Sequence, residues 1–156
     1  MPVTLDPLAA TPRHGLPLLF AGQTQKEFFI NEALMRLDSL CATMVLEQRN
    51  DPPVAGMQAG QIWLVGPQPS GAWAGFPLHL AAWSENGWRL MEPFLGQRVF
   101  DVGLACSRFY VDGDWSVPVA APTTSGGTVI DIEARAALAL IVDALVNSTL
   151  LASPQS

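Results

Sequence analysis

The chain is poor in charged residues, and this shortage excludes several kinds of partner. Charged residues make up 14% of the 156 residues, against roughly 25% in typical soluble domains. Only one lysine is present, and the net charge is −6. Non-specific affinity for nucleic acids and for anionic membranes comes from Lys and Arg. We therefore expect no nucleic-acid partner and no binding to an anionic membrane surface.

Cysteine and histidine are also scarce. Cys41 and Cys106 lie far apart among apolar neighbours and are expected to be buried, unbridged side chains. His14 and His79 do not combine with them in any metal-ligand spacing. No glycine-rich phosphate loop and no Gly-x-Ser-x-Gly turn occurs. The sequence thus predicts no metal, no cofactor and no enzyme activity.

Long apolar runs are missing too. The longest, residues 136–146, is interrupted by Asp143 and is too short to span a bilayer. Residues 1–8 lack the basic start of a signal peptide. We expect a chain that is made in a cytoplasm and does not insert into a membrane.

What the chain does contain is 49% apolar residues, with 13 Gly and 13 Pro. This composition excludes simple disorder. Residues 1–23 are rich in both proline and apolar side chains, so they predict an extended arm that docks on this chain or on a partner. Its docking residues are Leu5, Leu8, Leu16, Leu18 and Phe20.

A helix is predicted over residues 24–49. Apolar residues recur there at helical spacing, and the resulting face is expected to pack inward. The residues of this face are Ile30, Ala33, Leu34, Leu37, Leu40, Cys41, Met44 and Val45.

Short strand-like runs separated by turn residues fill residues 60–119, and they predict a small antiparallel β-meander or sandwich. Residues 120–128 have the composition of a linker. The fold class is therefore α+β, with an arm and a helix before the sheet and a helix after it.

The last helix, predicted over residues 129–152, is apolar on nearly every side. Such a helix must be buried, and a small sheet offers little room to cover it. Leu138, Ile141 and Leu145 have the alternating spacing of a helix–helix seam, and Ala134 allows close approach. We therefore expect a homo-oligomer held together by Ala134, Leu138, Ile141 and Leu145.

Five tryptophans leave two interpretations open. Trp83 and Trp88 flank the Glu85–Asn86–Gly87 turn and could stack with Trp73 on a host glycan, because indoles pack against sugar rings. Alternatively, these large aromatic side chains form the core of a small sheet. A third idea, a hydrolase or calcium site at Asp112 and Asp114, is weaker, because Asp and Gly are favoured there by the turn itself.

Taken together, the motifs resemble an uncharacterised domain family of phages and gene-transfer agents of alpha-proteobacteria, whose members are described as tail-fibre or virion-spike components. The motifs are LPLL (16–19), AGQTQK (21–26), NEALMRLD (31–38), GQIWLV (60–65), SGAWAG (70–75), LAAW (80–83), NGW (86–88), YVDGDW (110–115) and VIDIEARAA (129–137). Phe28–Phe29–Ile30 is more apolar than this family's pattern.

The resemblance implies a structural role in a virion and carries over no catalytic residue. The expected partners are capsid or tail proteins and a distal spike or fibre protein, besides copies of the chain itself. Because the chain carries little beyond the domain, we expect the base or adaptor of a head spike or fibre, with a host-glycan-binding module as the alternative.

Overall fold

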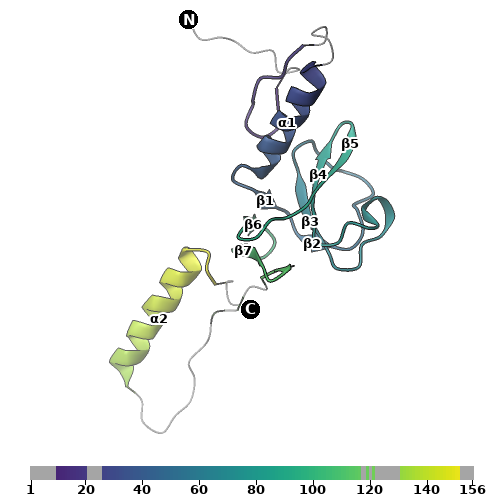
Figure 1. Ribbon diagram of the computed structural model, residues 1–156. Coiled ribbons are helices and arrows are strands. Elements are labelled where there is room, and N and C mark those ends of the chain that lie inside the picture. Colours follow the sequence, from purple (N-terminus) through teal and green to yellow (C-terminus); the bar gives the residue numbers. More distant parts are fainter. Residues whose placement is uncertain (1–9, 21–25, 117–118, 120, 122–130, 152–156) are drawn as a thin grey trace, which may run out of the picture. The chain divides into compact units, whose positions relative to one another are not determined.

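A computed structural model describes residues 10–20, 26–116, 119, 121 and 131–151 (Figure 1). Over these residues the chain has two α-helices and two four-stranded sheets, which confirms the α+β class. The elements in chain order are α1 (Lys26–Leu40), β1 (Met44–Val45), β2 (Gln48–Arg49), β3 (Ile62–Val65), the 3-10 turn η2 (Gly71–Trp73), β4 (Leu80–Ser84), β5 (Gly87–Met91), β6 (Arg98–Asp101), β7 (Cys106–Val111), β8 (Asp114–Trp115) and α2 (Ile132–Asn147).

The chain divides into two compact units, and residues 60–119, which were expected to hold the strands, contribute to both. Unit 1 contains residues 1–43 and 48–92, and unit 2 contains residues 44–47 and 93–156. Each unit holds one sheet, and the sheets share a topology in which a two-residue edge strand runs parallel to the first strand of an antiparallel meander. The neighbouring strands β1 and β2 supply these two edges.

The sheet of unit 1 has the order β2-β3-β4-β5. All four residues of β3 are buried, so this strand is a continuous apolar run rather than an alternating one. The β4–β5 hairpin lies where the Asn-Gly signal predicts a turn, and it aligns Trp83 with Trp88 and Ser84 with Gly87. Glu85 and Asn86 are thus the two central residues, and the positive φ of 107° falls on Gly87. The Ser84 hydroxyl donates to the Gly87 carbonyl at 2.8 Å, which closes the turn.

The sheet of unit 2 has the order β1-β6-β7-β8. Its β7–β8 turn holds Asp112 and Gly113 at positive φ values of 52° and 80°, the backbone that a two-residue Asp-Gly hairpin requires. Inside this sheet the buried guanidinium of Arg108 lies 3.5 Å from the buried carboxylate of Asp101. Arg108 also donates from Nε to the Ser116 carbonyl at 2.9 Å, so the buried cation has partners.

Helix α1 ends at Leu40, earlier than the expected residue 49. Ala42 has a left-handed φ of 44°, and the Thr43 hydroxyl donates to the Leu40 carbonyl at 3.0 Å and to the Ser39 carbonyl at 3.1 Å. Met44 and Val45 instead form the short strand β1, in which Met44 is exposed and Val45 is buried. Two apolar residues in a row, such as Met44 and Val45, fit helical spacing and strand alternation equally well.

The inward face predicted for this helix is also wrong. The buried residues of α1 are Asp38 and Ser39, whereas Ile30, Leu37 and Leu40 are exposed. Cys41, expected to be buried, is exposed as well, while Cys106 is buried as predicted, and both thiols are free. The apolar side of α1 therefore points away from the remainder of unit 1.

Helix α2 lies within the predicted range 129–152. The Asp131 carboxylate caps its first turn by accepting from the Ala134 N–H at 2.9 Å. At the other end, the Leu150 N–H donates to the Leu145 carbonyl at 3.0 Å and the Thr149 N–H donates to the Val146 carbonyl at 2.9 Å. This pair of bonds is the Schellman ending of a helix. The predicted linker, residues 120–128, lies outside the described residues except for the buried Ala121.

Candidate interaction surfaces

The four residues predicted to drive oligomerisation lie along one exposed face of α2. Leu138, Ile141 and Leu145 expose 49%, 56% and 36% of their surface, and Ala134 is also exposed. Their spacing of four, three and four residues places them in one row. We call this row the outer stripe of α2. No residue of α2 is buried within the described part of the chain.

The C-terminal end of α2 is tied to the sheet of unit 2. Thr149 adopts a left-handed φ of 59°, and its carbonyl accepts from the Ser107 N–H at 2.9 Å. Its hydroxyl lies 2.8 Å from the Ser107 hydroxyl and accepts from Arg98 at 3.3 Å. These contacts hold a β-branched residue in a conformation that it rarely adopts. The helix is thereby anchored at one end while its outer stripe stays open.

The arm docks on its own unit through the carboxylate of Asp38, which is 1% exposed. The Thr11 hydroxyl donates to Oδ1 at 2.7 Å, and the backbone N–H groups of His14 and Arg13 donate at 2.8 and 3.1 Å. The His14 ring nitrogen Nδ1 lies 3.1 Å from the same carboxylate. One buried carboxylate therefore organises the whole turn of the arm.

These bonds also set the ionisation of Asp38. Burial raises the pKa of its carboxyl, but the hydrogen bonds from Thr11, His14 and Arg13 oppose this and leave the pKa below its usual value. The ionised form is therefore the one that holds the arm.

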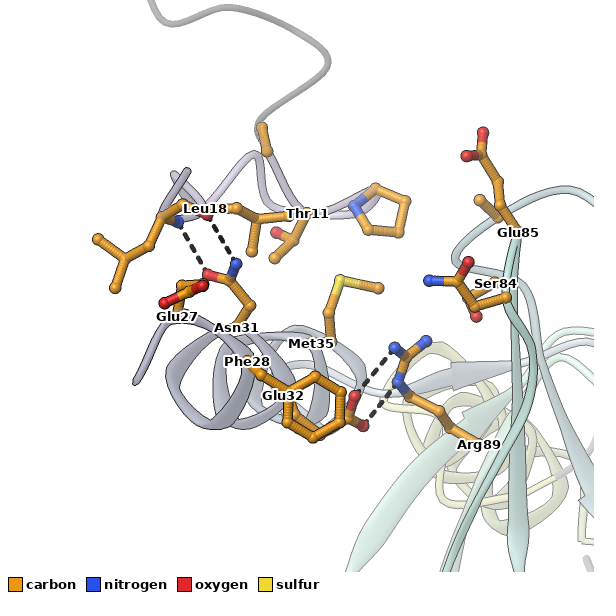
Figure 2. Close-up of a pocket in the computed structure, with 15 residues that line it drawn as sticks. Thr11, Leu18, Glu27, Phe28, Asn31, Glu32, Met35, Ser84, Glu85 and Arg89 are labelled. Carbon is orange, nitrogen blue, oxygen red and sulfur yellow. Dashed lines mark hydrogen bonds and ion pairs between the residues drawn. The ribbon is translucent and has the colours of Figure 1, made fainter. Parts of the chain in front are cut away.

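Two further contacts run along α1. The Arg13 guanidinium donates to the carbonyls of Ser39, Ala42 and Asp38 at 3.0, 3.1 and 3.2 Å, where the helix end is electronegative. The Asn31 side chain donates to the Leu19 carbonyl and accepts from the Leu19 N–H, both at 2.8 Å (Figure 2). This two-way amide pairing fixes Leu19 beside the helix. Residues 10–17 are not extended as predicted, because they fold back in a turn in which Ala10 pairs with Pro17 and the Thr11 N–H donates to the Leu16 carbonyl at 2.8 Å.

The apolar docking residues that the sequence predicts differ in exposure. Leu16 and Leu18 are half-buried and Phe20 is 68% exposed, while Leu5 and Leu8 lie outside the described residues. The sequence signal for the polar contacts was the Thr11, Arg13 and His14 group in an otherwise apolar arm.

The tryptophans of unit 1 pack on one another, with Trp88 in the centre. Its ring lies 4.8 Å from Trp83, 5.0 Å from Trp73 and 5.4 Å from Trp63 between centroids, each in an edge-to-face arrangement. Trp73 is 0% exposed, and Trp83 and Trp88 are half-buried. Such edge-to-face packing stabilises aromatic cores. We call these four residues the tryptophan cluster.

A cavity of about 950 Å³ lies between the arm, α1 and the β4–β5 hairpin (Figure 2). Across it, the guanidinium of Arg89 on β5 donates to both carboxylate oxygens of Glu32 on α1. The Nε atom donates at 2.8 Å and an Nη atom at 3.1 Å. The hydrogen bond from Arg89 holds the pKa of Glu32 below its usual value. The ion pair thus braces α1 on the hairpin, and Phe28 and Met35 supply apolar walls.

The remaining candidates show no further site. Asp112 and Asp114 are exposed in their turn, and Asp114 accepts from the Trp115 N–H at 2.7 Å. The His79 Nδ1 lies 2.9 Å from the Pro77 carbonyl. Among the described residues, no three His, Cys, Asp or Glu side chains are grouped to hold a metal ion. Neither described helix has both the length and the apolar character needed to cross a membrane.

Residues 30–116 match the model of a family described as a protein of unknown function, DUF2793. Because the match covers more than half of the chain, the chain belongs to this family. The matched segment runs from α1 through the β7–β8 hairpin, so it includes both sheets and excludes the described arm and α2. No curated protein matches the chain.

Proposed function

We propose that this chain is an oligomeric structural subunit of a phage particle, acting as the base or adaptor that joins a capsid or tail to a distal spike or fibre. The observation that carries the proposal is the outer stripe of α2. Leaving Leu138, Ile141 and Leu145 in water costs free energy, roughly 25 cal/mol for each Å² of apolar surface. A second copy of the same helix removes this surface by symmetry.

Two features support a structural role over a catalytic one. The polar residues Asp38 and Arg89 bind other parts of unit 1 and brace its fold. The resemblance to phage tail-fibre and virion-spike components spans much of the chain. The proposal assigns no reaction and no cofactor to the protein, and it places the chain in the virion after synthesis in a host cytoplasm.

The association is tested by size-exclusion chromatography with light scattering at micromolar concentration. The wild-type chain of 16.7 kDa should elute as a defined multiple of that mass. The double variant Leu138→Glu, Ile141→Glu should have a smaller mass than the wild type, while its circular dichroism signal from β-structure should be unchanged. The control Leu95→Glu alters an equally apolar residue that is 77% exposed in unit 2, and it should keep the wild-type mass. A monomeric wild-type chain would contradict the proposal.

The place in a particle is tested by cross-linking mass spectrometry on assembled phage. The proposal expects cross-links from this chain to a capsid or tail protein and to a distal spike or fibre protein. Cross-links to neither, in particles that contain the chain, contradict the adaptor role.

Binding of a host glycan through Trp83 and Trp88 is the second candidate, because both indoles keep partial exposure. Titration of tryptophan fluorescence with host polysaccharides tests it. Glycan binding is supported if the polysaccharide quenches the tryptophan fluorescence saturably and if Trp83→Ala removes this quenching while the protein stays folded. If the substitution only lowers stability, the indole is a core residue.

A further inference from the structure

The apolar side of α1 forms a second exposed stripe, in unit 1. Phe29 and Leu37 expose 73% and 51% of their surface, and Leu40 exposes 36%. With Ala33, these residues recur at four, four and three positions and so share one helix face. We call them the α1 stripe. The polar residues Asn31, Glu32 and Asp38 are engaged in other contacts of unit 1.

The charge beside the α1 stripe is positive. Lys26 and Arg36 are both exposed and flank the stripe near its two ends. Two carboxylates of the same helix already have partners within unit 1. Glu32 binds Arg89, and Asp38 binds the arm. A partner surface that matches this face is therefore apolar and acidic.

Helix α2 presents such a surface on the side away from its outer stripe. Ile132 and Leu140 expose 77% and 69% of their surface, and Ala136 lies between them. Glu133 and Asp143 flank these residues and are exposed. We call this the acidic face of α2.

We propose that the acidic face of α2 in one copy of the chain covers the α1 stripe of a second copy. The inference rests on the proposed oligomer and adds a second, different contact to it. The helices match in length, with 15 residues in α1 and 16 in α2. Lys26 and Arg36 are separated by the same number of residues as Glu133 and Asp143. The contact therefore brings a helix face with two bases against a helix face with two acids, which is a complementary charge pattern.

A contact between two α1 stripes fits the charges less well than a contact between α1 and α2. Lys26 and Arg36 flank each α1 stripe, and no acidic residue flanks it to balance them. Like charges across a helix contact are destabilising. The pairing of α1 with α2 is head-to-tail, and a head-to-tail contact that closes makes a ring. In this ring each α2 uses its acidic face for one neighbour and its outer stripe for the other copies.

Charge reversal in the full-length chain tests the contact. Variant X carries Lys26→Glu and Arg36→Glu, and variant Y carries Glu133→Lys and Asp143→Lys. Each variant alone should lose mass in light scattering relative to the wild type. A tagged X chain should capture Y at least tenfold better than it captures X, because only that pairing restores opposite charges. The chain with all four reversals should recover the wild-type mass.

Failure of this inference is distinguishable from failure of the proposed function. If X and Y keep the wild-type mass while Leu138→Glu, Ile141→Glu gives a monomer, the outer stripe holds the oligomer and this contact is overturned. If X loses mass but the fourfold reversal does not restore it, a surface other than the acidic face covers the α1 stripe, and the inference is again overturned. A monomeric wild-type chain overturns the oligomer itself.

Discussion

The hydroxyl of Thr11 donates a hydrogen bond of 2.7 Å to the buried carboxylate of Asp38, which also accepts the backbone N–H groups of Arg13 and His14. This bond joins a residue of the arm to a residue near the end of α1 that lies 27 positions later in the sequence. Residues 10–20 of the proline-rich arm are therefore held within unit 1 by polar contacts as well as by half-buried leucines.

Replacement of Asp38 should release the arm. In Asp38→Asn an amide N–H₂ group faces the N–H groups of the arm, so we expect a loss of about 2–3 kcal/mol in the free energy of unfolding. Cleavage by trypsin after Arg13 should become at least tenfold faster. Glu92→Gln, which changes an exposed acid of unit 1, is the control and should match the wild type. Unchanged cleavage in Asp38→Asn would show that the arm is held by other contacts.

The same carboxylate predicts a loss of stability in acid. The pKa of Asp38 is lower in the folded protein than in the unfolded chain. Its contribution is therefore complete above the unfolded value of about 3.9 and is lost as the pH falls through the folded value. Urea unfolding from pH 6 to pH 3 should show the gap between wild type and Asp38→Asn shrinking below about pH 4. A gap that is constant with pH contradicts the ionised carboxylate.

Substitutions of Thr149 can separate two contributions to stability at the end of α2, namely the strain of its left-handed backbone and the hydrogen bond of its hydroxyl. Thr149→Ala keeps the left-handed backbone but loses the hydroxyl, so it should lower stability by about 1–2 kcal/mol. Thr149→Gly loses the same hydroxyl but relaxes the backbone, and it should be more stable than the alanine variant by about 1 kcal/mol. Thr149→Ser retains the bond to Ser107 and serves as the control. Equal stability of the alanine and glycine variants would show that the backbone carries no strain.

Trp88 should matter more than its neighbours for the stability of unit 1. It touches three indoles, so Trp88→Ala should cost about 3 kcal/mol and remove much of the near-ultraviolet circular dichroism. Trp83→Ala, which loses a single ring pair, should cost less. If Trp83→Ala were the more damaging change, the cluster would not be centred on Trp88.

The two thiols should differ in reactivity. Cys106 is buried, and burial together with the nearby charge of Asp101 raises the pKa of its thiol. Cys41 is exposed. At neutral pH a thiol reagent should modify Cys41 quickly and Cys106 only after the protein is unfolded in urea. Cys41→Ser should remove the fast reaction, and Cys106→Ser should leave it intact. Loss of the fast reaction in Cys106→Ser would reverse the assignment.

Helical spacing identified which residues of α1 share a face but not where that face points. Periodicity records that Ile30, Ala33, Leu37 and Leu40 lie together, and an amphipathic helix normally turns this side inward. Here the other side carries Asp38, Asn31 and Glu32, which bind the arm and Arg89. Such contacts leave no periodic signal, because each polar residue has its own distant partner.

The turns, by contrast, were readable because their chemistry is local. Asn86–Gly87 and Asp112–Gly113 were expected at hairpins and are found there, with Trp83 opposite Trp88. The division into two sheets was not readable. β1 and β2 are two residues long and neighbours in sequence, yet they pair with β6 and β3 respectively. Nothing in so short a segment specifies which sheet an edge strand joins.

The sequence by itself determined the α+β class, the hairpin turns and the apolar α2 helix, because each of these depends on neighbouring residues and their periodicity. Only the tertiary structure decided that Asp38 fixes the arm, that Arg89 braces α1, and that Trp88 lies at the centre of the tryptophan cluster. These arrangements join residues up to 57 positions apart. Their energies depend on burial and geometry that exist only once the chain has folded.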